Sequence, residues 1–381
     1  MRATLAIVVM FGCSGRDATP TPTPTSTPSP TPIPSRTPST STSPSPSASC
    51  AEIAVSPPRR EERVSFRPRE VQGKNLTASY EMSYVAVAGG QRWAGSAYDG
   101  AALWDGSERL RHIACVTSAC LPHEVAFTDG GKTLLVGLSR FDVETGQGTV
   151  PEVEPALEST GLNEIESVAW GPDGALMVVA AQHRPSRCCR DRATPERASP
   201  PRFLALDGKT GALVKDLGQR WSQAAAVSAT QIVAATRDGL TVWDRETFTP
   251  TLRAGQQASR LYLHPDGALL ASVAGGEITL WRMPDFCPVA RFAADREFVQ
   301  ALAFHPTAPV LFTAGTDRTI RAFSTSTAEA GMTLGAYPVP GTRAAIDQVS
   351  RTMAVTADGR LLVVPLYMDE RVLVLEIALP P

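Results

Sequence analysis

Leu261-Tyr-Leu-His-Pro-Asp-Gly, followed at once by Ala268-Leu-Leu-Ala-Ser-Val, is the stretch of sequence that decides the fold of this chain. It predicts a short strand, a tight turn and a second strand, because proline presets φ and glycine accepts a left-handed conformation. The same turn recurs in Val125-Ala-Phe-Thr-Asp-Gly-Gly, Val168-Ala-Trp-Gly-Pro-Asp-Gly, Met353-Ala-Val-Thr-Ala-Asp-Gly and, in a divergent copy, Leu302-Ala-Phe-His-Pro-Thr-Ala. A turn that returns in this way indicates an internal structural repeat.

A second motif follows the first at a similar distance. Its copies are Asp99-Gly-Ala-Ala-Leu-Trp-Asp, Asp238-Gly-Leu-Thr-Val-Trp-Asp, Gly276-Glu-Ile-Thr-Leu-Trp and Asp317-Arg-Thr-Ile-Arg-Ala-Phe. An Asp-x-x-Thr turn also recurs, beginning at Asp142, Asp207 and Asp244. With these motifs in this order, residues 80 to 380 resemble the WD-repeat propellers, whose blades end their third strand in Trp-Asp. The chain lacks that family's Gly-His pair, so the usual histidine network is not expected. The resemblance does imply structural roles for His264 and His305.

The repeat predicts an all-β, seven-bladed β-propeller of the WD-repeat kind. Its seven first strands are anchored at Val85, Val125, Val168, Ala225, Leu261, Leu302 and Met353. The two longest spacings place insertions near 182–201 and 337–350. The chain ends before a fourth strand of the last blade can form, so we expect the segment near Arg63–Phe66 to supply it and remove an exposed edge. In an alternative register, which starts the last blade near Ala344, the C-terminus closes its own blade.

The N-terminus predicts export and a lipid anchor. Residues 1–12 are typical of a signal peptide, with Arg2 before a short apolar run that is too short to span a bilayer. Met10-Phe11-Gly12-Cys13 resembles the lipobox of bacterial lipoproteins, which implies lipidation of Cys13. We therefore expect a chain that is exported and lipid-anchored to the bacterial cell envelope, at the outer membrane on its periplasmic or surface side.

A spacer separates the anchor from the propeller. Residues 13–50 contain a Thr/Pro/Ser tract with almost no apolar side chains, so we expect a disordered linker that cannot offset the entropy of ordering. The propeller is predicted over residues 51–381.

Two groups of residues are candidates for partner binding. In WD-repeat propellers, the residues just before each first strand lie at one mouth of the central channel. Here all seven are polar: Ser83, His123, Glu166, Gln223, Ser259, Gln300 and Arg351. The alternative is that these residues are polar only because the positions before the strands are exposed to solvent. The insertion after Gln182 carries Arg184, Arg187, Arg190 and Arg192, which could pair with an acidic partner or form a solvated loop.

The cysteines predict disulfides. Without Cys13, six remain, and an even number is typical of exported proteins with disulfide bonds. Fifteen pairings are open among Cys50, Cys115, Cys120, Cys188, Cys189 and Cys287, with Cys115–Cys120 the most plausible local pair. We expect no metal site, because no histidine lies at ligand spacing beside either close pair.

Composition and motifs favour a binding protein over an enzyme. The chain has 36 Lys plus Arg against 38 Asp plus Glu, which gives no reason to expect a nucleic-acid partner. Nucleophile elbows, zinc helices and phosphate loops are absent from the sequence, so no cofactor and no catalysis are predicted. We expect an envelope lipoprotein with a monomeric propeller that binds a protein. The alternative is a periplasmic enzyme or small-ligand sensor that uses the channel, with His123 and Glu166 as an acid–base pair.

Overall fold

The structure is a computed structural model. It describes residues 60–69, 84–97, 100–106, 108–114, 124–183, 200–295, 298–326, 329–339, 352–366 and 371–379. The predicted signal peptide and linker lie outside these residues.

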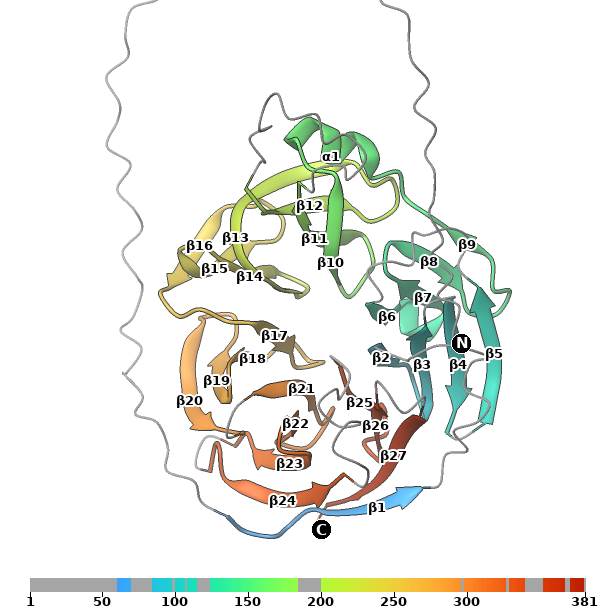
Figure 1. The fold of residues 1–381 in the computed structure, drawn as a ribbon, viewed down its shortest axis with the longest axis vertical. Coiled ribbons are helices and arrows are strands. Elements are labelled where there is room, and N and C mark those ends of the chain that lie inside the picture. Colours follow the sequence, from blue (N-terminus) through green and yellow to red (C-terminus); the bar gives the residue numbers. More distant parts are fainter. Residues whose placement is uncertain are drawn as a thin grey trace, which may run out of the picture. The chain divides into compact units, whose positions relative to one another are not determined.

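Within these residues the chain is almost entirely β, and its antiparallel sheets form a ring around a central axis (Figure 1). The first sheet contains β2 (Tyr84–Val87), β3 (Arg92–Ala97), β4 (Gly100–Asp105) and β5 (Glu108–Ala114). The next contains β6 (Val125–Thr128), β7 (Thr133–Val136), β8 (Ser139–Asp142) and β9 (Gly148–Thr149), with a 3₁₀ turn at Asp129–Gly131.

Three further four-stranded sheets lie later in the chain. One contains β17 (Arg260–Leu263), β18 (Leu269–Ala274), β19 (Glu277–Arg282) and β20 (Cys287–Ala293). Another contains β21 (Val299–Phe304), β22 (Val310–Gly315), β23 (Thr319–Ser324) and β24 (Thr333–Pro338). The last contains β25 (Ala354–Val355), β26 (Leu361–Leu366), β27 (Arg371–Ala378) and β1 (Ser65–Arg69).

A seven-stranded sheet occupies the middle of the sequence. It contains β10 (Glu164–Trp170), β11 (Leu176–Gln182), β12 (Arg202–Asp207), β13 (Leu213–Val227), β14 (Gln231–Thr236), β15 (Gly239–Asp244) and β16 (Pro250–Ala254). The long strand β13 pairs with β12 along its first half and with β14 at its end. It therefore serves as the outer strand of one four-stranded group and the inner strand of the next.

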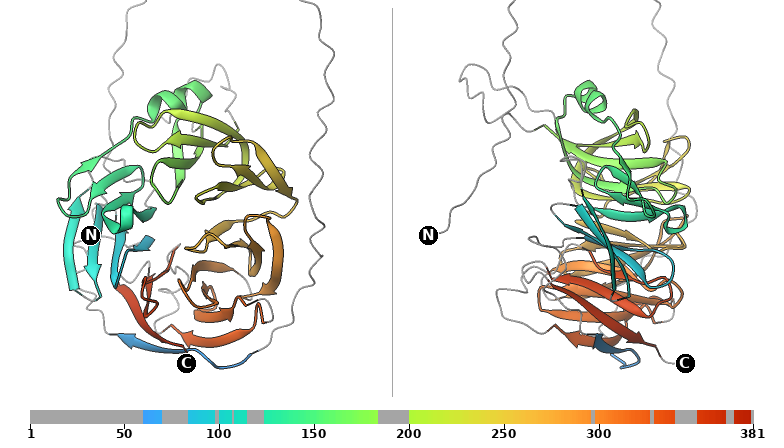
Figure 2. Two further views of the ribbon diagram at one scale, coloured as in Figure 1. Left: turned by 180° about the vertical axis from the view of Figure 1, so that it is seen from behind. Right: turned by 90° about the vertical axis from the view of Figure 1, so that its right-hand side faces the viewer.

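This arrangement confirms the all-β propeller predicted from the repeat. Each predicted anchor lies within a first strand or, for Met353, directly before one. Because β13 merges two four-stranded groups into one continuous sheet, the count of seven blades stays a prediction. The helix α1 (Glu154–Thr160) packs Ala156 and Leu157 into the core beside β10, β11 and β12 and lies at the outer rim (Figures 1 and 2). No described helix is long and apolar enough to cross a membrane.

The N-terminal strand closes the last sheet, as predicted from the missing fourth strand. β1 pairs antiparallel with β27, with Ser65 opposite Ala378. Just before β1, the backbone N–H groups of Glu61 and Arg63 donate to β24 carbonyls at 2.8 and 2.7 Å. The segment thus joins two neighbouring sheets, and the alternative in which the C-terminus closes its own blade is wrong.

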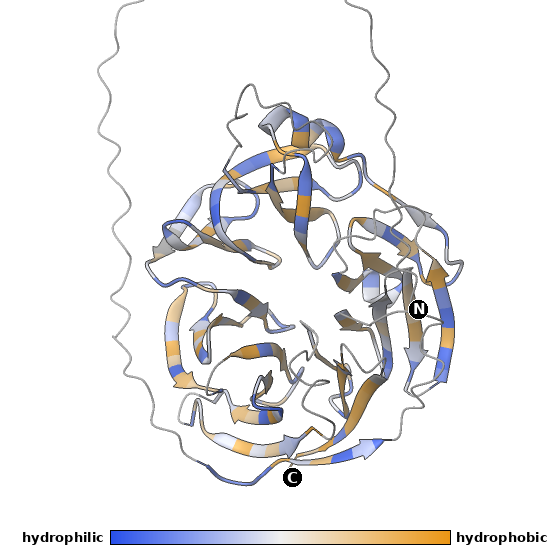
Figure 3. Ribbon diagram, viewed as in Figure 1, coloured by the Kyte–Doolittle hydropathy of each residue, from blue (hydrophilic) through white to orange (hydrophobic). Residues whose placement is uncertain are grey.

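The core lies in the layers between adjacent sheets, where hydrophobic residues follow the strands (Figure 3). Trp93 and Trp104 show the pattern: their rings stack 4.2 Å apart, and Trp93 Nε1 donates to the Gly106 carbonyl at 2.8 Å. Both indoles are buried against Leu361 and Val372 of the last sheet. Such burial is the main favourable contribution to folding, at about 25 cal/mol per Å² of apolar surface.

The repeated Asp-x-x-Thr turn caps the hairpin between third and fourth strands. Asp142 Oδ1 accepts hydrogen bonds from the backbone N–H of Thr145 at 2.6 Å and from its hydroxyl at 2.8 Å. Asp207 and Asp244 repeat both contacts three residues on. The backbone donor, followed by the hydroxyl, lowers the pKa of all three carboxyl groups. The motif is therefore structural.

Side chains cross between neighbouring four-stranded groups on the turn side, which we define as the end that carries the turns between first and second strands. Arg245 Nη2 donates to both carboxylate oxygens of Asp173, at 2.6 and 2.8 Å. His264 Nε2 donates to the His305 carbonyl at 3.1 Å, and His305 Nε2 donates in turn to the Gly359 carbonyl at 3.1 Å. The two histidines link three consecutive sheets, which is a structural role of the kind that the resemblance implies.

Candidate binding site at the channel mouth

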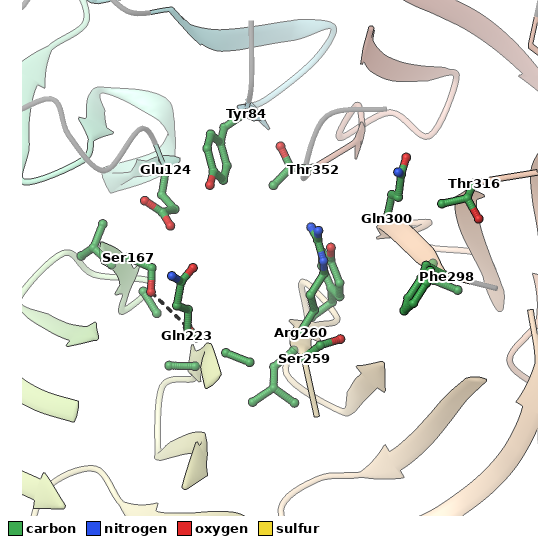
Figure 4. Close-up of a pocket in the computed structure, with 17 residues that line it drawn as sticks. Tyr84, Glu124, Ser167, Gln223, Ser259, Arg260, Phe298, Gln300, Thr316 and Thr352 are labelled. Atoms are coloured by element: carbon green, nitrogen blue, oxygen red, sulfur yellow. Dashed lines mark hydrogen bonds between the residues drawn. The ribbon is translucent and has the colours of Figure 1, made fainter. Parts of the chain in front are cut away.

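A pocket of about 560 Å³ lies at the opposite end of the first strands, which we call the channel mouth (Figure 4). The predicted residues Gln223, Ser259 and Gln300 line it. Ser83, His123 and Arg351 lie outside the described residues. Their direct neighbours in sequence, Tyr84, Glu124 and Thr352, line the pocket. The first strands thus bring residues far apart in sequence to one opening.

Glu166 is the predicted residue that does not line the pocket. The register of β10 shifts between Ile165 and Ser167, and this bulge places Ser167 on the lining. Glu166 instead accepts hydrogen bonds from Arg220 Nη2 and, at 3.1 Å, from Gln223 Nε2. The Arg220 side chain is only 8 % exposed, so this ion pair is largely shielded from water.

The ion pair fixes part of the pocket wall. Gln223 donates to Glu166 through its side chain, and its backbone carbonyl accepts a 3.0 Å hydrogen bond from the Ser167 hydroxyl (Figure 4). Glu166 is therefore engaged as an acceptor within the wall. The suggested acid–base pair with His123 cannot be placed, because His123 lies outside the described residues.

The lining combines hydroxyl, amide and apolar groups with two charged side chains of opposite sign, Glu124 and Arg260. Both point into the pocket, from different sheets (Figure 4). Burial raises the pKa of the Tyr262 phenol, and the charge and hydrogen bond of Arg260 oppose that shift. Tyr262 is consequently a neutral hydroxyl at physiological pH. The mouth is polar and nearly balanced in charge.

Two large aromatic side chains are exposed to solvent in the segments that lead into first strands. Phe298, before β21, is 60 % exposed, and Trp221, in the middle of β13, is 61 % exposed. Phe298 also lines the pocket. Large exposed aromatics of this kind are typical of protein-binding surfaces, where they bury much area at a low cost in side-chain entropy.

A buried carboxylate holds the segment that carries Phe298. Asp295, whose side chain is 1 % exposed, accepts hydrogen bonds from the Phe298 backbone N–H at 3.1 Å and from the Thr316 hydroxyl at 3.3 Å. Arg321 approaches Asp295 to 3.8 Å and also pairs with Asp317. The buried carboxylate thus holds the backbone N–H of Phe298 in place.

The other predicted site residues lie largely outside the described residues. This holds for Arg184, Arg187, Arg190 and Arg192 and for Cys13, Cys50, Cys115, Cys120, Cys188 and Cys189. Cys287, the first residue of β20, is disulfide-bonded. No group of three His, Cys, Asp or Glu residues within the described part of the chain could hold a metal ion.

Sequence reasoning missed Arg260, Tyr262, Phe298 and Thr316 at this site. Arg260 and Tyr262 flank the anchor Leu261, so the alternation of side chains along a strand was the signal that could have found them. Phe298 and Thr316 precede β21 and follow β22, in connections whose lengths differ from sheet to sheet, and no repeated motif marks them.

Comparison with known proteins supports the fold. Residues 286–324, which include β20 to β23, match the family model described as WD40: WD domain, G-beta repeat. A chain in a solved structure titled "Crystal Structure of Mitotic Checkpoint Complex" matches with a TM-score of 0.57 and 15 % sequence identity. The match covers 86 % of this chain and 96 % of that chain. No curated protein matches the sequence.

Proposed function

We propose that this chain is a non-catalytic platform that binds a partner protein at the channel mouth. The observation that carries the proposal is Phe298, which is 60 % exposed although buried Asp295 fixes its backbone. An exposed aromatic side chain gains free energy when a partner covers it, and an aromatic ring with two χ angles loses little conformational entropy on binding. Proteins built as WD40 propellers commonly serve as scaffolds for other proteins.

The composition of the mouth supports recognition of a protein surface. Ser167, Gln223 and Ser259 contribute hydroxyl and amide groups that can hydrogen-bond a partner's backbone, and Phe298 supplies an apolar anchor at the side of the pocket. This mixture of an aromatic anchor and a polar surround is the usual anatomy of a protein interface. The arginines of the insertion, Arg184 to Arg192, would add contacts to an acidic partner.

The test is to compare partner capture by single variants of the intact chain. Phe298→Ala should weaken the complex by about 2 kcal/mol, roughly thirtyfold in Kd, as expected for an interface aromatic. Trp221→Ala should weaken it too. Val214→Ala is the matched control, because Val214 is 46 % exposed on the outer half of β13, away from the mouth. Equal losses in Val214→Ala and Phe298→Ala, measured by quantitative pull-down, would place the interface elsewhere.

We further propose that the platform is exported and held at the bacterial envelope by lipid on Cys13, with residues 13–50 as the spacer. The support is the sequence pattern of residues 1–13. Cys13→Ala should move the protein from the membrane fraction to the soluble fraction and abolish labelling by radioactive palmitate. Labelling that persists in the variant would refute the anchor.

A second candidate is a small-ligand sensor, favoured by the volume of the mouth pocket, which lies within the usual range for small molecules. Glu124 and Arg260 would then bind groups of opposite charge. A small molecule that stays bound in native mass spectra and is lost in Glu124→Gln would favour this candidate over the protein platform.

A further inference from the structure

The junctions between neighbouring sheets are braced on the turn side by side chains. Besides the Arg245–Asp173 and histidine contacts, Gln231 Nε2 donates to the Pro284 carbonyl at 2.9 Å, and Gln91 Nε2 donates to Asp358 Oδ2 at 3.3 Å. Arg140 donates to the Gly174 carbonyl and lies over the Trp170 ring. Two arginines on this side, Arg140 and Arg245, thus have a partner in a neighbouring four-stranded group.

The junction between β2–β5 and β6–β9 differs. It contains a cleft of about 720 Å³ between β3, β5 and the turn before β7. Three cationic side chains line it: Arg92, Arg111 and Lys132. Within the described residues, none of the three makes a side-chain hydrogen bond or forms an ion pair. Arg111 does lower the pKa of the nearby Asp142 carboxyl group, but within the described residues the three cations have no hydrogen-bonded counter-ion.

Arg92 is the most telling of the three. Its Nε atom is shielded from water and has no hydrogen-bond partner. A buried guanidinium donor without an acceptor costs free energy, on the order of 1–3 kcal/mol, so such groups are normally satisfied. Because Arg92 lines the cleft, an oxyanion bound there would compensate the charge of this guanidinium.

The reason for this difference is visible in the sequence. The turn between β2 and β3 reads Ala88-Gly-Gly-Gln, whereas the corresponding turn between β10 and β11 carries Asp173, the partner of Arg245. The first sheet thus has no aspartate at the position of Asp173, and Val143 stands in the second sheet where Arg245 stands after β15. Gly131 packs so closely on Ala88 that a Cβ added there would lie 2.9 Å from the Ala88 methyl group. The inner part of the junction is filled, and the cleft lies outside it.

Two acidic residues also line the cleft, and they limit what it can bind. Asp142 Oδ1 is occupied by the backbone N–H and hydroxyl of Thr145, and Arg111 contributes to the lowered pKa of this carboxyl group. Glu144 is exposed. Three cations against two carboxylates leave one net positive charge, which suits a single anionic group rather than a polyanion.

We propose that this cleft binds a small molecule that joins one oxyanion, a phosphate, sulfonate or carboxylate, to an apolar body. Arg92 and Arg111 present the planar donors that oxyanions favour, and Lys132 adds a point charge. Leu103, Leu110 and Val143 form the apolar part of the wall. The volume lies within the range of small-molecule sites. This site is at the opposite end of the strands from the channel mouth, so it does not depend on the proposed function.

The proposal is tested by titrating the purified full-length chain, in detergent, with phenyl phosphate, inorganic phosphate and phenol by isothermal calorimetry. Phenyl phosphate should bind at least tenfold more tightly than inorganic phosphate, and phenol should give no signal. Arg92→Gln and Arg111→Gln should each weaken phenyl phosphate binding tenfold or more. Higher salt should weaken it as well, because the attraction is partly electrostatic.

Arg291→Gln is the matched control, since Arg291 is an exposed arginine that pairs with Glu277 on β19, at another junction. It should leave phenyl phosphate binding unchanged, as should Phe298→Ala at the mouth. If Arg92→Gln does not fold, Arg111→Gln and Lys132→Gln carry the test, because both side chains are exposed. Failure of the wild-type chain to bind phenyl phosphate would overturn the proposal, as would binding that survives substitution of all three cations.

Discussion

The turn side and the channel mouth are built from the same strands, but the repeat supplies similar residues to the turn side and different residues to the mouth. On the turn side, residues of the repeat make the same contact again and again, as the Asp-x-x-Thr turns at Asp142, Asp207 and Asp244 do. At the mouth, each first strand contributes a different side chain, and three of the strands there, β10, β13 and β21, have register shifts. Residues that recur in each repeat are therefore the ones that stabilise the ring. Residues that differ from one repeat to the next are the ones that can take part in binding.

The difference also appears in burial. On the turn side, His305 is 4 % exposed and both ring nitrogens form hydrogen bonds, whereas Phe298 at the mouth is exposed to solvent. We expect substitutions on the turn side to change stability and substitutions at the mouth to change binding. Three measurements of stability test this contrast.

Removing β1, the strand that closes the last sheet, should have the largest effect on the stability of the fold. Deletion of residues 51–70 would expose the edge of β27 and remove Val64 and Phe66 from the core. We expect a loss of about 5 kcal/mol, roughly 10 °C in Tm, together with aggregation. Differential scanning calorimetry and light scattering measure both. Deletion of residues 19–49 is the control and should leave Tm unchanged, because a tract with almost no apolar side chains contributes nothing to the core. Equal tolerance of the two deletions would contradict closure by β1.

His305→Ala should destabilise the fold by about 2–3 kcal/mol, because a cavity forms and buried donors lose their acceptor. His305 Nδ1 accepts from the backbone N–H groups of Thr307 and Ala308, and Nε2 donates to the Gly359 carbonyl. Gln223→Ala at the mouth is the comparison and should cost less than about 1 kcal/mol. Chemical denaturation checks both values. Comparable losses of stability in the two variants would show that residues of the turn side do not contribute more to stability than residues of the mouth.

The smallest effect we expect is the dependence of stability on pH that protonation of His305 causes. Burial lowers the pKa of His305, and the charge of His264 lowers it further, whereas the hydrogen bond to Gly359 and the charge of Asp358 oppose the shift. Because the folded pKa lies below the unfolded value, the unfolded chain binds the proton more readily, so stability falls as pH drops below about 6.5. Wild-type Tm should therefore decline between pH 7 and pH 5 more than that of His305→Gln. Parallel declines would exclude His305 as the cause.

Much of the fold could be predicted from the sequence because turns are local. Proline and glycine at fixed offsets define the Asp-Gly turns, and the spacing of those turns sets the order of the strands. Even ring closure by β1 followed from counting strands in the last repeat. Pro68 and the charged Arg67 and Arg69 suit its position on an outer edge, where an unpaired strand would otherwise invite aggregation.

The site could be predicted only in outline. Polar residues before the first strands do lie near the mouth, but the bulge at Glu166 turns that side chain toward Arg220 and puts Ser167 in its place. Side chains alternate with a period of two, so one extra residue exchanges the two faces of a strand. Bulges leave no reliable mark in a single sequence.

The sequence by itself determined the strand-and-turn repeat, because each turn depends on a few adjacent residues. Only the tertiary structure decided that β13 runs unbroken between two four-stranded groups and that Asp295 holds the Phe298 loop. Packing of the sheets is also what brings Arg92, Arg111 and Lys132 together at one cleft between the first two sheets. These features depend on contacts between residues distant in sequence, and such contacts exist only once the sheets have packed into the ring.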